Sequence, residues 1–233
     1  MSHERIASTF DEWAKSGRGE NMEYGHGDVV AQALEQLDIR AGSQVLDLGC
    51  GIGWATRLLA GSAPGVQAIG IDVSPSMVAE AEKLSSLRIR ARYEVGSFEK
   101  LDFKDGKFEL VFSMEALYYA PDLAKALSEI ARVLKPGGRA EVIVDCYAGR
   151  PTTADWPEAV GLSLQVLSEK EWRAAFTAAG FAEVDSERLI DRRGAGKEAD
   201  FTPGSCFGEF KAYQDYHDAG SLWIRASMAP AAS

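Results

Sequence analysis

The chain has few cysteines, few histidines and no long apolar run, and each shortage excludes a class of protein. Its 233 residues include three cysteines, an odd number that provides no disulfide framework. The three cysteines and three histidines are scattered rather than closely spaced, so we expect no metal site. No apolar run approaches the ~18 residues of a membrane-spanning helix, and no secretory signal is apparent. These absences predict a cytoplasmic protein without a membrane partner.

Positive charge is also in short supply. The chain carries 25 Lys and Arg residues against 35 Asp and Glu residues, a formal net charge of −10. Because proteins bind nucleic acid through surfaces rich in Lys and Arg, this balance argues against a nucleic-acid partner, although a local basic patch could survive the average. A hydrophobic content of 46% is typical of a globular protein. We therefore expect a single domain over residues 1–233.

The most informative segment is an apolar strand, Val45–Leu48, that runs into three glycines, Gly49, Gly51 and Gly53. Glycines accept positive φ and let a ligand approach the backbone, and the helix that follows points free N–H groups toward that ligand. A second apolar strand ends at Asp72, 19 residues after Gly53. A carboxylate there can accept hydrogen bonds from both ribose hydroxyls. This pattern predicts the first half of a nucleotide-binding α/β fold.

Two ligand classes use such a layout. A dinucleotide-binding turn requires Gly or Ala three residues after its second glycine. Counted from either candidate glycine, that place is held here by Trp54 or Thr56. A dehydrogenase is therefore the weaker alternative.

Three motifs occur in order between residues 38 and 147. They are Asp-Leu-Gly-Cys-Gly-Ile-Gly at 47–53, Gly-Ile-Asp-Val-Ser at 70–74 and Leu-Lys-Pro-Gly-Gly at 134–138. With them the sequence resembles the class I S-adenosylmethionine (SAM)-dependent methyltransferases, in particular the small-molecule branch. The resemblance implies a Rossmann-like methyltransferase fold, in which a doubly wound, mostly parallel seven-stranded α/β sheet with an antiparallel last strand carries helices on both faces. It also implies SAM as cofactor and in-line transfer of its methyl group.

Alternating strand and helix patterns agree with a doubly wound sheet. Strands are expected at 44–48, 66–73, 88–95, 108–114, 139–146, 181–190 and 222–228, and helices at 28–37, 54–60, 76–84, 121–134 and 168–176. The third strand is less apolar and alternates, as an edge strand does. The motif Pro136-Gly137-Gly138 should end the helix expected at 121–134.

Three segments fall outside this core. Residues 1–27 are expected to form an N-terminal arm or lid, with any helix broken at 17–20 by Gly17 and Gly19. Residues 147–167 and 192–221 exceed ordinary loop lengths and are predicted to be insertions near the active site. The second is rich in aromatic residues, which suits a small helical insertion covering the site or a partner surface. A packed structural extension is an equal alternative.

The resemblance also implies cofactor contacts. Asp47 would bind the ammonium end of SAM, directly or through water, or would cap the turn. Met77 would pack on adenine, and Ser97 stands where many relatives have an adenine-binding Asp. The expected contacts are Tyr24, Asp47, Gly49, Gly51, Gly53, Asp72, Val73, Met77, Ser97, Phe98 and Met114.

Four residues are candidates for catalysis. His26 could act as a base near neutral pH or make only a local hydrogen bond. It follows Tyr24, whose ring is expected to face the sulfonium with ~0.5–2 kcal/mol of cation–π attraction. Tyr118 and Tyr119 would face the substrate cavity, although at least one should be in the core. Asp145 could orient a substrate amine, accept a proton, or cap the following loop.

The segment after the fourth strand, Ser113–Tyr119, lacks the Pro-Pro-aromatic and Pro-Cys motifs of enzymes that methylate nucleic-acid bases. This favours a small-molecule acceptor. The alternative is a SAM-binding regulatory or scaffold protein without catalysis. The sequence leaves open the acceptor, the methylated atom and whether the chain forms a homodimer.

Overall fold

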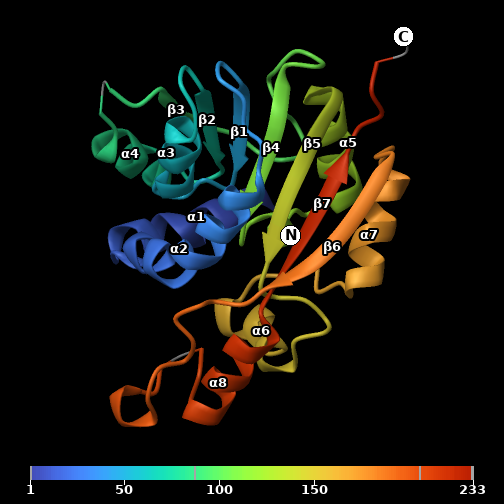
Figure 1. The fold of residues 1–233 in the computed structure, drawn as a ribbon. Helices are drawn as coiled ribbons and strands as arrows, with labels where there is room; N and C mark the ends of the chain where they lie inside the picture. The colour runs from blue at the N-terminus through green and yellow to red at the C-terminus, as the bar shows by residue number, and fades with distance from the viewer. Residues whose placement is uncertain (1, 87, 205, 232–233) are drawn as a thin grey trace.

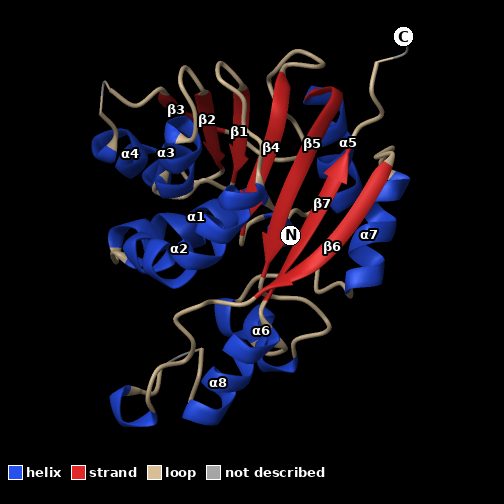
Figure 2. Ribbon diagram, viewed as in Figure 1, coloured by secondary structure: helices blue, strands red, loops and turns tan. Residues whose placement is uncertain are grey.

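The computed structural model describes residues 2–86, 88–204 and 206–231, which form a seven-stranded sheet between two layers of helices (Figures 1 and 2). The strand order is β3-β2-β1-β4-β5-β7-β6. The strands are β1 (Gln44–Leu48), β2 (Gln67–Asp72), β3 (Ala91–Val95), β4 (Phe108–Met114), β5 (Leu134–Val144), β6 (Glu183–Leu189) and β7 (Ser221–Ser227). Strands β1 to β5 pair in parallel, whereas β7 is antiparallel to both of its neighbours. The predicted fold, including β3 at an edge, is confirmed.

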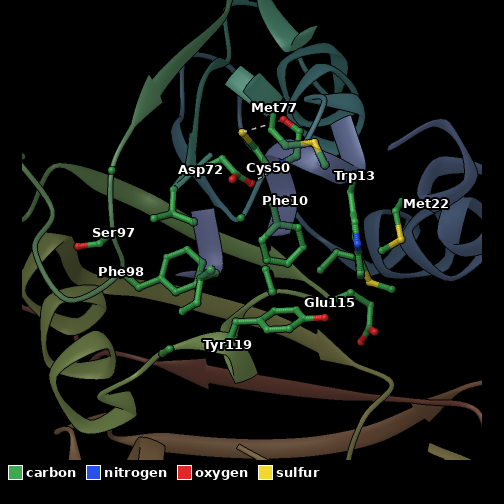
Figure 3. Close-up of a pocket in the computed structure, with 18 of the residues that line it drawn as sticks. Phe10, Trp13, Met22, Cys50, Asp72, Met77, Ser97, Phe98, Glu115 and Tyr119 are labelled. Atoms are coloured by element: carbon green, nitrogen blue, oxygen red, sulfur yellow. Dashed lines mark hydrogen bonds between the residues drawn. The ribbon is translucent and has the colours of Figure 1, made fainter. Parts of the chain in front are cut away.

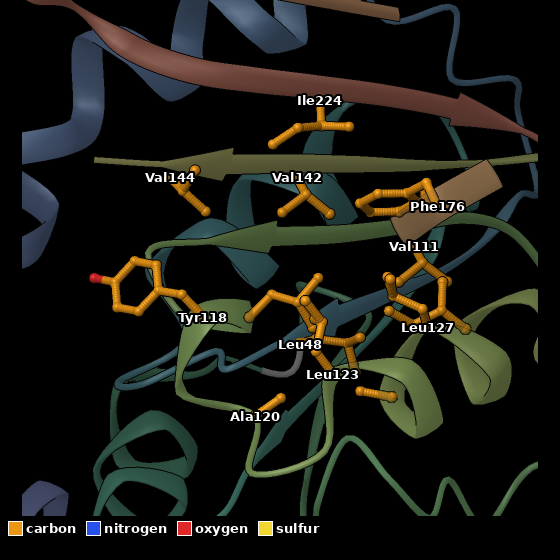
Figure 4. Packing of buried hydrophobic residues seen from close by; sticks show 14 of the residues in the cluster. Leu48, Val111, Tyr118, Ala120, Leu123, Leu127, Val142, Val144, Phe176 and Ile224 are labelled. Atoms are coloured by element: carbon orange, nitrogen blue, oxygen red, sulfur yellow. The ribbon is translucent and has the colours of Figure 1, made fainter. Parts of the chain in front are cut away.

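The helices divide between the two faces. They are α1 (His3–Lys15), α2 (Arg18–Gln36), α3 (Trp54–Gly61), α4 (Pro75–Leu84), α5 (Leu123–Val133), α6 (Trp156–Val160), α7 (Glu169–Ala178) and α8 (Phe210–Ala219). Helices α2 and α3 pack through Val30 and Leu59 against one face. Helices α5 and α7 pack through Leu127 and Phe176 against the other, which Figure 4 shows from close by. Central strands such as β4 are therefore apolar at successive positions, because both faces are buried.

The start of β5 differs from the prediction, whereas α5 ends within one residue of its predicted end at 134. The helix stops at Val133, and Leu134 adopts extended backbone and pairs with Phe108. Strand β5 therefore begins five residues before the predicted position 139, with an irregularity between Phe108 and Leu110. The Pro-Gly-Gly motif lies inside this irregular start of β5, where Gly137 has φ 72°, rather than at the helix end.

The N-terminal region, predicted as an arm or lid, is helical. Helix α1 ends at Lys15, Gly17 takes φ 73°, and α2 then runs without a break from Arg18 to Gln36. The predicted break is thus confirmed at Gly17, but Gly19 lies within the helix and α2 starts ten residues before the expected 28. Buried Val29, Val30 and Ala33 anchor α2 to the sheet, so tertiary packing overrides the low helix propensity of its glycines.

The two long segments form helical insertions at the carboxyl end of β5. The first contains α6 and a short 3₁₀ helix (Pro151–Thr153), and the second contains α8 and another (Glu198–Asp200). Figure 1 shows α6 and α8 together beyond this edge of the sheet. The Trp156 and Tyr216 rings lie 5.8 Å apart, so the insertions pack on one another. Within the described ranges, no helix has both the length and the apolar character needed to span a bilayer.

Candidate cofactor and acceptor site

The glycine turn after β1 depends on positive φ angles and on close packing that leaves no room for side chains at two of its glycines. Gly49, Gly51 and Gly53 all have positive φ, between 52° and 76°. A Cβ at Gly49 would lie 2.1 Å from the Cβ of Ala116, and one at Gly53 would lie 2.4 Å from the Tyr93 ring. Gly51 differs, because a Cβ there would meet nothing within 4 Å. Two glycines are therefore required by packing, while Gly51 leaves the backbone open to the adjoining cavity.

Asp72 closes the turn from the end of β2. Its Oδ2 accepts a hydrogen bond from the Gly51 N–H at 2.9 Å, and its Oδ1 accepts one from the Ser74 N–H at 2.9 Å. Burial raises the pKa of Asp72 to about 6, against the effect of these two donors. Ser74 caps α4 by accepting from the Met77 N–H. Each carboxylate oxygen of Asp72 keeps a lone pair that a ligand hydroxyl can use.

A cavity of about 860 Å³, including its open mouth, lies between the glycine turn, α1, α2 and the loops after β2, β3 and β4. In Figure 3, Ser97 and Phe98 lie at one end, Asp72 and Met77 lie next to each other, and Glu115 and Met22 lie at the other end. The predicted residues that line it are Gly49, Gly51, Asp72, Val73, Met77, Ser97, Phe98, Met114, His26 and Tyr119.

Tyr24 is not in this cavity, which contradicts the expectation that it faces the sulfonium. Its residue is 80% exposed, and its ring faces the Arg193 guanidinium at 5.2 Å. The side chain lies on the outer side of α2, a helix that the sequence placed too late. Phe10 and Trp13 of α1 line the cavity instead, and the Phe10 ring meets Tyr119 edge to face at 5.0 Å.

Asp47 and Gly53 lie behind the turn and do not line the cavity. Asp47 is 1% exposed, and its Oδ2 accepts a hydrogen bond from the Thr56 hydroxyl at 2.6 Å. Burial raises its pKa to about 7. Of the two roles considered for Asp47, the arrangement favours bracing the turn against α3 over a direct contact with a ligand.

His26 reaches the far end of the cavity from α2. Its Nδ1 lies 2.9 Å from the Met22 carbonyl oxygen, and its Nε2 lies 3.2 Å from the Asp145 carboxylate. Both partners are hydrogen-bond acceptors, so both ring nitrogens carry a proton. Burial favours the neutral ring, but the hydrogen bond and charge of Asp145 prevail and raise the pKa of His26 to about 9. His26 is therefore a cation without a free lone pair, and the predicted role as a base is not supported.

Asp145 is the centre of a buried ion-pair network. Its Oδ1 lies 2.7 Å from the Arg150 Nη1, and its Oδ2 accepts from the Tyr216 hydroxyl. Burial acts to raise the pKa of Asp145, but Arg150 and His26 hold it well below its ordinary value. Asp145 does not line the main cavity. It is a fixed anion that joins α2 to both insertions. In this position its carboxylate does not contact a substrate bound in that cavity.

Glu115 was not singled out from the sequence, yet it lines the cavity directly after β4. Its Oε2 accepts from the Tyr118 hydroxyl at 2.7 Å, and its Oε1 accepts from the Asp145 N–H. Tyr118 is 2% exposed, so it is the core tyrosine of the pair, whereas Tyr119 lines the cavity. The one available signal was position, since side chains at the carboxyl ends of parallel strands converge on ligands.

Comparison with known proteins agrees with this geometry. A family model described as "Methyltransferase domain" matches residues 46–142. A Haloferax volcanii putative methyltransferase, solved in complex with the Trm112 methyltransferase activator, superposes with a TM-score of 0.86 and 32% identity over 94% of this chain and 97% of that one. The chain belongs to the class I SAM-dependent methyltransferases.

Curated relatives of this methyltransferase act on different acceptors. It is 30% identical to 27-O-demethylrifamycin SV methyltransferase of Amycolatopsis mediterranei over 72% of this chain and 69% of that one. It is 32% identical to 2-methyl-6-phytyl-1,4-hydroquinone methyltransferase of Synechocystis over 59% of this chain. The chain spans 50% of the Synechocystis protein and 35% of the Arabidopsis thaliana tocopherol O-methyltransferase.

The methyltransferase cavity fits SAM. Asp72 has lone pairs for the ribose, Gly51 leaves room beside the backbone, and Phe10, Trp13 and Tyr119 provide aromatic surface for a cation. His26, Glu115 and Asp145 also place possible ligand atoms within 4.8 Å of one another. Because His26 donates through both nitrogens and Asp145 is paired with Arg150, this group suits an ion-pair network better than a metal.

Proposed function

We propose that this methyltransferase transfers the SAM methyl group to an uncharged, apolar small molecule. The observation that carries the proposal is the composition of the cavity wall. Phe10, Trp13, Met22 and Tyr119 line it, and no Lys or Arg does so among the residues that the structure describes. Such a wall favours an acceptor with an apolar body.

Phosphorylated acceptors fit this cavity poorly. Recognition of a phosphate relies on Arg or Lys donors, which the described lining does not contain. Its ionisable groups are instead Asp72, Glu99, Glu115 and two histidines, of which His26 is already paired with Asp145. The relatives include both a phytyl-hydroquinone methyltransferase and a phosphoethanolamine N-methyltransferase, and the lining supports an acceptor of the first kind.

The residues of the chain contribute mainly position and exclusion of water. Holding an acceptor in line with the transferred methyl group can supply on the order of 7–11 kcal/mol of the barrier. Helix α1 covers the cavity and is held at two places. Asp11 accepts from Ser74 and from the Ser76 N–H, and His3 bonds to Glu99 at 2.8 Å. A closed α1 keeps water from the nucleophile.

The test is transfer of label from methyl-labelled SAM to three acceptors: 2-methyl-1,4-hydroquinone, a sterol and phosphoethanolamine. We expect label in a neutral acceptor and none in phosphoethanolamine. Label in phosphoethanolamine alone would contradict the acceptor class. Tight SAM binding with no transfer to these acceptors or to any component of a metabolite extract would favour the non-catalytic SAM-binding alternative. An Asp72→Ala variant, which removes the ribose contact, is the matched control for cofactor-dependent label.

A further inference from the structure

The backbone of Glu115 is held in a conformation that side chains rarely adopt. Its φ of 53° makes it the one residue other than glycine with positive φ in the described part of the chain. Such a conformation is strained and tends to occur at functional sites. The surroundings hold it through three hydrogen bonds, from the Glu115 N–H to the Ile143 carbonyl at 2.9 Å and from Asp145 and Tyr118 to its carboxyl group. The hydrogen bonds from Asp145 and Tyr118 fix the carboxyl group in the cavity wall.

The carboxyl group of Glu115 sits among a defined set of charges. Asp145 and His26 face it from the loop after β5 and from α2, Tyr118 donates to it, and Arg150 and Tyr216 bind the far side of Asp145. Burial and the negative charge of Asp145 raise the pKa of Glu115 to about 8, although His26 opposes this. The two neighbouring carboxyl groups thus differ, since Asp145 stays ionised while Glu115 is neutral near pH 7. Carboxyl pairs separated in this way are typical of acid–base sites.

We propose that Glu115 is the catalytic residue that accepts the proton lost by the methyl acceptor, and that the positive charge of bound SAM converts it from a neutral carboxyl group to a carboxylate. This inference rests on the proposed function. The bond from the acceptor atom to the methyl carbon forms as the sulfur–methyl bond breaks, and the electron pair of that bond returns to sulfur. The proton of the acceptor atom passes to Glu115. The acceptor class is therefore one whose nucleophilic atom carries a proton, such as a phenol or hydroquinone.

The test does not require a known acceptor. S-adenosylhomocysteine has the amino acid, ribose and adenine of SAM but lacks the sulfonium charge. Calorimetric titration of each ligand at pH 7 in phosphate and in Tris buffer gives the number of protons released on binding. A nearby opposite charge lowers a carboxyl pKa by roughly 1–3 units. Binding of SAM should therefore release about half a proton or more per protein in excess of the number released by binding of S-adenosylhomocysteine.

Two variants test whether Glu115 is the source of the difference in proton release between SAM and S-adenosylhomocysteine. Glu115→Gln keeps the size of the side chain and should reduce the difference to near zero. Because the Glu115 carboxylate and the sulfonium charge stabilise each other, this variant should also weaken SAM binding by about twofold to 100-fold and S-adenosylhomocysteine binding by less. Glu99→Gln is the matched control, because Glu99 is another buried carboxyl group of the same cavity but is bonded to His3 at its mouth. The Glu99 variant should keep the difference.

The outcomes separate the two proposals. Equal proton release by both ligands in the wild type, with tight binding, overturns the role of Glu115 and leaves the methyltransferase proposal intact. Absence of SAM binding overturns the proposed function itself. A Glu115→Gln variant that retains the difference also overturns the assignment. If that variant does not fold, Tyr118→Phe provides a second test. It removes a hydrogen bond that lowers the pKa of Glu115, so the pH at which proton release on SAM binding is half-maximal should rise. An unchanged pH curve would contradict the proposal.

Discussion

The two ends of the cavity are built differently. The cofactor end takes its shape from main chain and short contacts, as where Gly51 and Ser74 donate to Asp72. These two hydrogen bonds join consecutive βα units. The acceptor end is built from side chains that are far apart in sequence, and His26 and Tyr216 both bond to Asp145. A local motif can encode the first kind of site, whereas the second exists only once the chain has folded.

The largest effect should come from breaking the network at the acceptor end. Arg150→Met leaves Asp145 with one cation fewer in a buried setting, and loss of one partner of such a pair costs about 3–5 kcal/mol. We expect that loss in the free energy of unfolding, measured by urea titration. Arg40→Met is the control, since Arg40 and Asp38 form an exposed pair that should contribute less than about 1 kcal/mol. Equal effects for the two variants would mean that the network does not hold the insertions in place.

At the cofactor end, the expected effect is measured as the affinity for SAM. Asp72→Ala removes a charged acceptor of two ligand hydrogen bonds, and hydrogen bonds to charged groups contribute about 1.5–3 kcal/mol each. SAM affinity should therefore fall by at least roughly 100-fold in a calorimetric titration. Undiminished affinity would show that the cofactor end has been placed wrongly. Asp72→Asn keeps one carbonyl acceptor, so its affinity for SAM should lie between those of the wild type and Asp72→Ala.

The network should also make stability depend on pH through His26. The pKa of this ring is raised in the folded protein, from 6.5 to about 9. Its contribution to stability is therefore fully present below pH 6.5 and is lost as the pH rises through 9. The difference in unfolding free energy between wild type and His26→Gln should be on the order of 1–3 kcal/mol at pH 6 and should shrink by pH 9.5. A difference that grows with pH would mean that the ring is neutral.

The sequence predicted the sheet and most of the cofactor end because both depend on local patterns. Strand β4 was placed at its observed bounds, and Asp72 was placed beside the glycine turn. The errors came from tertiary packing. The sequence predicted a break at 17–20 and a helix that begins only at residue 28, but α2 already begins at Arg18 and packs on the sheet. Tyr24 was consequently assigned to the wrong side. Glu115 carries no motif, and its strained backbone and its contact with the Asp145 N–H appear only in three dimensions.

The smallest expected effect is a difference in SAM affinity between variants of two aromatic residues, one in α1 and one in α2. Trp13 lines the cavity from α1, whereas Tyr24 is 80% exposed on α2. A cation beside an aromatic face gains about 0.5–2 kcal/mol, so Trp13→Ala should weaken SAM binding by roughly 2- to 30-fold. Tyr24→Ala should change it by less than about twofold. Because S-adenosylhomocysteine lacks the sulfonium charge, its affinity should fall less than that of SAM in the Trp13 variant. A larger loss in the Tyr24 variant would mean that α2 rotates to bring Tyr24 inward when the ligand binds.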